Sequence, residues 1–89
     1  MRKLDLPDTF DDYDAFEIEE KGYFENLPIL WDGEPKILTF FDPVRLSQDI
    51  QADLDEGYTV HFSHLVVVSK LTTEQMQAAL DNLPEDFFD

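Results

Sequence analysis

The dipeptide Asp32-Gly33 is the feature that most limits which folds this chain can adopt. It separates two strand-like apolar stretches, residues 27–31 and 36–41. Asp-Gly in that setting favours a β-hairpin, because glycine tolerates the positive φ of a tight turn. Pro35 has no N–H to donate, so we expect a turn wider by a residue or two. Residues 37–41 are apolar on both faces, which predicts a central strand covered on both sides, or on one side by a partner.

A helix is expected directly after this hairpin. Asp42 suits the N-cap, and Pro43 suits the first helical position, where its missing N–H is not needed. The four-residue spacing of Leu46, Ile50 and Leu54 predicts a buried stripe. Gly57 is the expected end of this helix.

Residues 58–69 alternate between two sets of side chains and predict the longest strand of the protein, with a bend near Ser63-His64. A second helix should follow, capped by Thr72 with Gln75 in a capping box, and stopped by Pro84. Its inward face is expected to comprise Met76, Ala79, Leu80 and Leu83.

Residues 5–20 hold eight acids and no base, interleaved with apolar side chains. Residues 5–14 show neither helical nor strand periodicity, so we expect residues 1–14 to form an acidic N-terminal arm. From Phe16 the side chains alternate, which predicts a short edge strand over 16–20 whose charges discourage unwanted pairing. Residues 85–89 are expected to form a short acidic and aromatic C-terminal tail.

These elements predict one α+β domain, built as a small two-layer sandwich. The expected sheet has three or four strands with two helices, in the order β-(β-hairpin)-α-β-α. If residues 36–41 and 58–68 pair in parallel through the first helix, the crossover should be right-handed, and both helices could cover the same sheet face.

The net charge of −15 decides which partners are plausible. A phosphate backbone or an anionic membrane would be repelled, because both are bound through clustered Lys and Arg. The charge does not prevent folding. Leu, Ile, Val and Phe make up 28 of the 89 residues, about a third of the chain, whereas charged chains stay disordered when this share is below ~20%. We therefore expect a folded protein that binds neither nucleic acid directly nor a membrane.

The chain has no cysteine, which excludes disulfides, thiolate metal sites and thiol catalysis. Arg2 and Lys3 are followed by Asp5, Pro7 and Asp8 rather than by an apolar run, so no signal peptide is expected and a cytoplasmic location is the prediction.

No residue pattern indicates a cofactor, a metal site or an enzyme. His61 and His64 would lie on opposite faces of a strand. Asp8, Asp11, Asp12 and Asp14 do not match a calcium-binding loop, because Tyr13 stands where that loop needs glycine. No phosphate-binding loop or nucleophile motif is present, and we expect no catalysis.

The acidic, aromatic segment is the candidate partner-binding site. Aromatic side chains would anchor a partner while carboxylates steer its approach. The expected anchors are Phe10, Tyr13 and Phe16, and the steering acids are Asp8, Asp11, Asp12, Asp14, Glu17, Glu19 and Glu20.

The leading hypothesis is a noncatalytic binding module that docks on a basic surface of another protein, as an inhibitor or a nucleic-acid mimic. The alternative is a structural or assembly protein that self-associates through an apolar sheet face, so both a monomer and a homodimer stay open. The acidity is equally compatible with a solvated face or with adaptation to salt.

Overall fold

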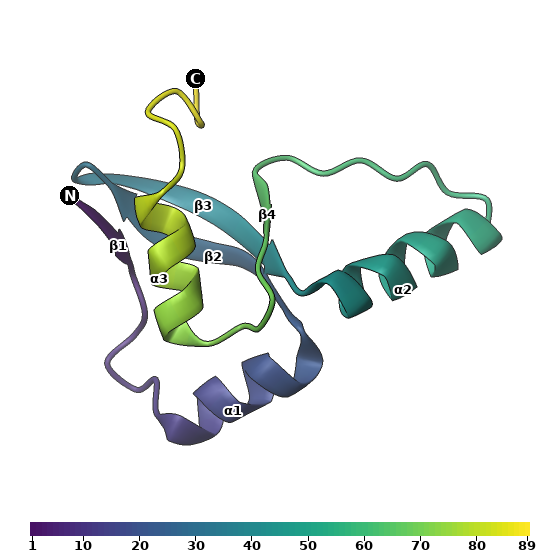
Figure 1. The fold of residues 1–89 in the computed structure, drawn as a ribbon, viewed down its shortest axis with the longest axis horizontal. Coiled ribbons are helices and arrows are strands. Elements are labelled where there is room, and N and C mark those ends of the chain that lie inside the picture. The colour runs from purple at the N-terminus through teal and green to yellow at the C-terminus, as the bar shows by residue number, and fades with distance from the viewer.

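The structure is a computed structural model that describes residues 1–89. Its sheet has the order β1-β2-β3-β4, and the strands are β1 (Arg2–Leu4), β2 (Tyr23–Trp31), β3 (Glu34–Phe41) and β4 (Leu65–Val67) (Figure 1). The helices are α1 (Asp12–Lys21), α2 (Pro43–Asp55) and α3 (Thr73–Asp81). The α+β class is confirmed, with a four-stranded mixed sheet and three helices rather than two.

The hairpin between β2 and β3 is confirmed, but its turn is not widened. Asp32 (φ 52°) and Gly33 (φ 88°) form a two-residue turn, and Trp31 pairs directly with Glu34. Pro35 is accommodated because it pairs with Leu30 at the second position of the ladder, where the strand's N–H points away from its partner. Only the far end of β3, residues 39–41, pairs with β4, so no bond is lost there.

The crossover from β3 through α2 to the parallel strand β4 is also confirmed. The strand predicted over 58–69 is wrong in length, since only residues 65–67 are extended and paired. The bend expected at Ser63-His64 limits it, because His64 adopts φ 54°, which a continuous strand does not tolerate. Residues 58–64 therefore form a loop.

The core lies between one face of the sheet and α3. Leu27, Leu38 and Phe40 are fully buried, and Met76 and Leu80 of α3 pack with them. Ala79 and Leu83 are half-buried against the same cluster, as the sequence predicted. The Thr72 hydroxyl accepts a hydrogen bond from the Gln75 amide at 3.1 Å.

The predicted capping box at α3 is only half formed. The Gln75 side chain does not reach back to Thr72; its Oε1 instead accepts hydrogen bonds from the Ser69 hydroxyl at 2.7 Å and the Lys70 amide at 3.2 Å. The side chain thereby fixes the loop before the helix.

The first predicted helix does not cover the sheet. Asp42 caps α2 as expected, accepting a hydrogen bond from the Arg45 amide at 2.7 Å. Figure 1 shows α2 projecting sideways from the sheet. No residue of α2 is buried: Leu46 and Ile50 are half-buried, and Leu54 is 53% exposed. The expected buried stripe is therefore wrong.

The two ends of the chain meet over the core. Arg2 in β1 places its guanidinium 3.8 Å from the centre of the Trp31 ring and donates to the carbonyls of Leu80 and Leu83. The Phe88 ring packs edge-on against Trp31, with ring centres 4.9 Å apart. The C-terminal residues thus fold back onto the core instead of trailing into solvent.

Candidate functional site

The candidate segment folds as the helix α1, and the edge strand predicted over 16–20 is wrong. The Asp14 amide donates to the Asp11 carboxylate at 3.0 Å, and the Asp11 amide donates to the Asp14 carboxylate at 3.3 Å. This reciprocal pair starts the helix by satisfying amides that lack intrahelical partners. Gly22, at φ 77°, ends it, and its amide donates to the Ile18 carbonyl at 3.0 Å.

The helical geometry regroups the predicted side chains. In a strand, Phe16, Ile18 and Glu20 would share a face. In a helix, residues three or four apart share a face, so Tyr13, Phe16 and Glu20 turn outward while Ile18 turns toward the sheet. Ile18 packs against the core cluster.

The outer face of α1 exposes two large aromatic side chains. Tyr13 is 66% exposed and Phe16 is 61% exposed. Their neighbours on this face are exposed acids, namely Asp12, Glu19 and Glu20. The structure therefore unites five of the predicted site residues in one acidic surface with an aromatic centre, which we call the α1 outer face.

Glu17 modifies the chemistry of this face. It raises the pKa of the Tyr13 phenol above its ordinary value of 10.0, first as a hydrogen-bond acceptor and then through its negative charge, with a smaller contribution from desolvation and from the charge of Asp14. The shift extends the pH range in which the phenol stays protonated and can donate a hydrogen bond.

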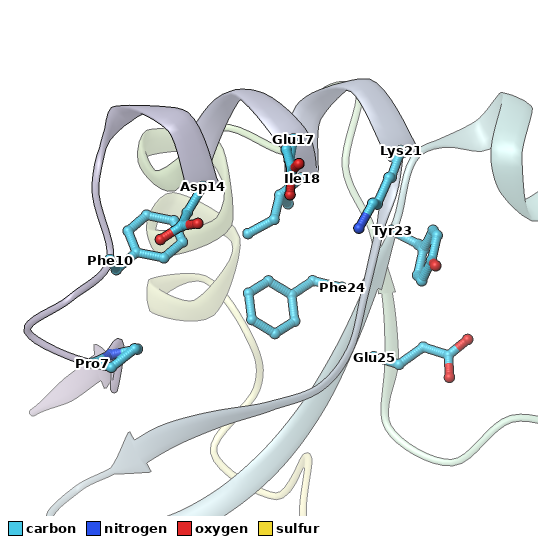
Figure 2. Close-up of a pocket in the computed structure, with 9 residues that line it drawn as sticks. All are labelled: Pro7, Phe10, Asp14, Glu17, Ile18, Lys21, Tyr23, Phe24 and Glu25. Atoms are coloured by element: carbon cyan, nitrogen blue, oxygen red, sulfur yellow. The ribbon is translucent and has the colours of Figure 1, made fainter.

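A pocket of about 390 Å³ lies beneath α1, between the helix and β2 (Figure 2). Phe10, Ile18 and Phe24 form its apolar lining. Its charged groups are the carboxylates of Asp14, Glu17 and Glu25 and the ammonium of Lys21. Figure 2 shows the Lys21 side chain directed from the helix toward β2. The pocket is an acidic cavity with an apolar floor, which suits the stem and head of a long cationic side chain.

The predicted site residues therefore divide into three groups. Asp12, Tyr13, Phe16, Glu19 and Glu20 form the outer face; Phe10, Asp14 and Glu17 line the pocket; Asp8 and Asp11 are exposed residues preceding the helix. Sequence reasoning missed Lys21, Tyr23, Phe24 and Glu25, which β2 and the helix end bring to the pocket. Only the spacing of Asp11 and Asp14, followed by Lys21-Gly22, could have indicated the helix.

The histidines and the remaining acids form no second site. His61 and His64 are exposed, and the His64 ring lies 4.7 Å from the centre of the Phe88 ring. No three His, Asp or Glu side chains are grouped so that they could hold a metal ion. None of the three helices has the length and apolar composition needed to cross a membrane.

Comparison with protein-family models, with curated proteins and with solved structures finds no match to this chain.

Proposed function

We propose that this protein is a noncatalytic binding module that docks the α1 outer face on a basic surface of a partner protein. The observation that carries the proposal is the pair Tyr13 and Phe16, both more than half exposed, surrounded by carboxylates on a helix whose two ends are fixed. Aromatic side chains lose little conformational entropy on binding and bury a large area, which makes them effective anchors.

The pocket beneath α1 supplies the polar half of the interaction. Glu17 links the pocket to the α1 outer face, because it lines the pocket and raises the pKa of Tyr13 one helical turn away. An Arg or Lys side chain of the partner would lay its stem on Phe10 and Phe24 and place its cation among the carboxylates. Arginine suits this position best, since its guanidinium binds carboxylates in a bidentate manner and is weakly hydrated.

The net charge of −15 also favours a basic partner. At physiological salt the Debye length is ~8 Å, so steering depends on acids near the contact rather than on the total charge. The α1 outer face concentrates such acids around its aromatic anchors. A partner surface that normally binds nucleic acid would have the matching positive charge, and the module would then act as its inhibitor.

Affinity capture at low and high salt tests this proposal. The protein should retain a basic partner at low salt and release it as salt rises. The double variant Tyr13→Ser/Phe16→Ser should weaken retention at least tenfold, because each lost aromatic anchor typically costs more than ~1 kcal/mol. Ala78→Ser, at an exposed position on α3, is the matched control and should bind as the unmodified protein does.

Equal retention of the double variant and the control would refute docking through α1. A captured partner should also lose its affinity for nucleic acid when the module is added. Unchanged nucleic-acid binding would refute the inhibitory role while leaving the docking itself intact.

A further inference from the structure

The sheet face opposite α3 is apolar, and it is uncovered except at its Phe41 end, where the Phe62 ring packs. The strand register places alternate residues on this side, and Ile37 is 57% exposed and Val67 is 47% exposed. We call it the open sheet face. Its in-register members are Lys3, Tyr23, Pro28, Leu30, Pro35, Ile37, Thr39, Phe41, Leu65 and Val67; Phe41 is buried and packs against the rings of Tyr23 and Phe62.

The charge of this face differs from that of the rest of the molecule. The chain has 21 acids, yet none occupies an in-register position on the open sheet face, and Lys3 is its only charged residue. Exposed apolar patches of ~300 to 600 Å² on a small protein are often functional. The acid-free composition indicates that this face meets an apolar surface that is not itself basic.

The same chain carries a projecting element with several exposed apolar side chains. We define the α2 arm as residues 43–64, comprising α2 and the loop that returns from it. Val44 is 67% exposed, Leu54 53%, Tyr58 61% and Phe62 42%. The charged side chains of the arm are Arg45, Asp49, Asp53, Asp55 and Glu56. The arm is therefore apolar with a net negative charge.

Contacts at the base of the arm join it to one end of the sheet. The Asp42 amide donates to the Gly22 carbonyl at 2.8 Å. The Arg45 guanidinium lies 4.7 Å from the centre of the Tyr23 ring, and its Nε donates to Asp49 at 2.9 Å. Helices that connect parallel strands normally pack back onto the sheet. Here the helix projects. Arg45 and Phe62 contact Tyr23 and Phe41 at one end of the open sheet face, while the exposed side chains of the arm and the rest of the face have no partner.

We propose that a second copy of this chain covers the face. In a two-fold dimer, the α2 arm of each copy lies across the open sheet face of the other. The dimensions agree: a 13-residue helix is ~20 Å long, and an eight-residue strand is ~26 Å long. This proposal is independent of the α1 outer face, which takes no part in the contact.

The area also agrees with a stable dimer. Two long and two short strands, spaced ~4.8 Å apart, present roughly 400 Å² on the open face. Without the end that Phe62 already covers, each copy loses roughly 300 Å² from its face and a similar area from its arm, so about 1,200 Å² is buried in total, the lower end of the range for a specific interface.

Charge complementarity favours the arm over a basic partner. Lys3 faces an incoming arm whose charges are mostly acidic, whereas a cationic partner would meet no in-register carboxylate on this face. The two copies nevertheless repel each other through their −15 charges. Added salt screens that repulsion, so the dimer should tighten as salt rises, opposite to the behaviour expected of docking through α1.

Sedimentation equilibrium at micromolar to millimolar concentration tests the assembly. We expect a dimer whose association strengthens as salt rises. The variant Ile37→Glu, on the open sheet face, should associate at least about tenfold more weakly than the unmodified protein. Tyr13→Ser/Phe16→Ser is the matched control and should dimerise normally. A strict monomer, or a dimer weakened by the control and not by Ile37→Glu, would overturn the proposal without touching the function proposed for α1.

Cross-linking tests the reciprocal geometry. The chain contains no cysteine, so Ile37→Cys and Leu54→Cys each introduce a single thiol. A short bis-maleimide should link the two variants when they are mixed, in greater yield than either variant links to itself. Self-linking of Ile37→Cys alone would show face-to-face packing, and no mixed product would show that the arm does not reach the face; either result overturns the proposal.

Discussion

Arg2 concentrates several interactions that hold the two ends of the chain together. Its side chain is only 10% exposed, and its guanidinium donates to the carbonyls of Leu80 at 3.0 Å and Leu83 at 2.6 Å while covering the Trp31 ring. The last carbonyls of a helix lack intrahelical donors and carry partial negative charge. One cation from the first strand thus caps the last helix.

Arg2→Ala should therefore destabilise the protein by about 2 to 4 kcal/mol, because it removes charge-assisted hydrogen bonds and leaves those carbonyls without donors. Urea unfolding gives the free energy. Lys70→Ala, at an exposed position whose backbone alone is hydrogen-bonded, should change it by less than ~0.5 kcal/mol. Equal changes in the free energy of unfolding for the two substitutions would show that the Arg2 hydrogen bonds do not stabilise the protein.

At the level of the elements, the junction of α1, β2 and α2 is closely packed around Gly22. Gly22 joins α1 to β2 at φ 77°, and a Cβ there would lie 2.5 Å from an Asp42 carboxylate oxygen and 3.0 Å from the Arg45 Cβ. Gly33 has a similar φ of 88° in the hairpin turn, but a Cβ there would meet nothing within 4 Å. The pair separates backbone strain from steric crowding.

Gly33→Ala should cost about 1 to 2 kcal/mol, the strain of a left-handed conformation. Gly22→Ala should cost roughly 1 to 3 kcal/mol more, because overcrowding displaces the start of α2. Thermal and urea unfolding of both variants measure the difference. If Gly22→Ala proves no more destabilising than Gly33→Ala, the base of the α2 arm is looser than the contacts indicate.

Elements with strong end signals could be predicted from the sequence, and those defined by long-range contacts could not. Asp32-Gly33, Asp42-Pro43 and Thr72 each act locally, and the hairpin, α2 and α3 follow from them. At 16–20 the alternation of Phe16 and Ile18 favoured a strand, yet the Asp11–Asp14 cap and Gly22 make a helix. The pocket needed β2 to bring Phe24 and Glu25 under α1, which no local pattern shows.

At the scale of the whole molecule, the charge of −15 is distributed around a thin body with extents of 40 × 34 × 19 Å. Such a charge opposes compaction through self-repulsion. Only four ion pairs, including that of the N-terminal amine with Asp32, offset it. The free energy of unfolding should therefore respond more strongly to the salt concentration than to the loss or gain of a single ion pair.

We expect the thermal midpoint, measured by circular dichroism at a concentration where the protein is monomeric, to rise as sodium chloride is raised from low to moderate levels. Glu19→Gln/Glu20→Gln, on the exposed side of α1, should raise the midpoint at low salt and reduce its salt dependence, since both charges belong to the repelling set. A midpoint that falls with salt would mean that ion pairs outweigh repulsion.

The position of α3 has a consequence for how the protein is made. This helix, residues 73–81, is the main cover of the core, and the Arg2 guanidinium in the first strand finds its acceptors only at the helix end. During synthesis the hairpin can form early, but its apolar face stays open until residues 73–81 have left the ribosome. The nascent sheet is therefore unprotected until α3 has been made, and a chain that stops before residue 73 exposes the apolar face that α3 covers instead of folding as a smaller protein.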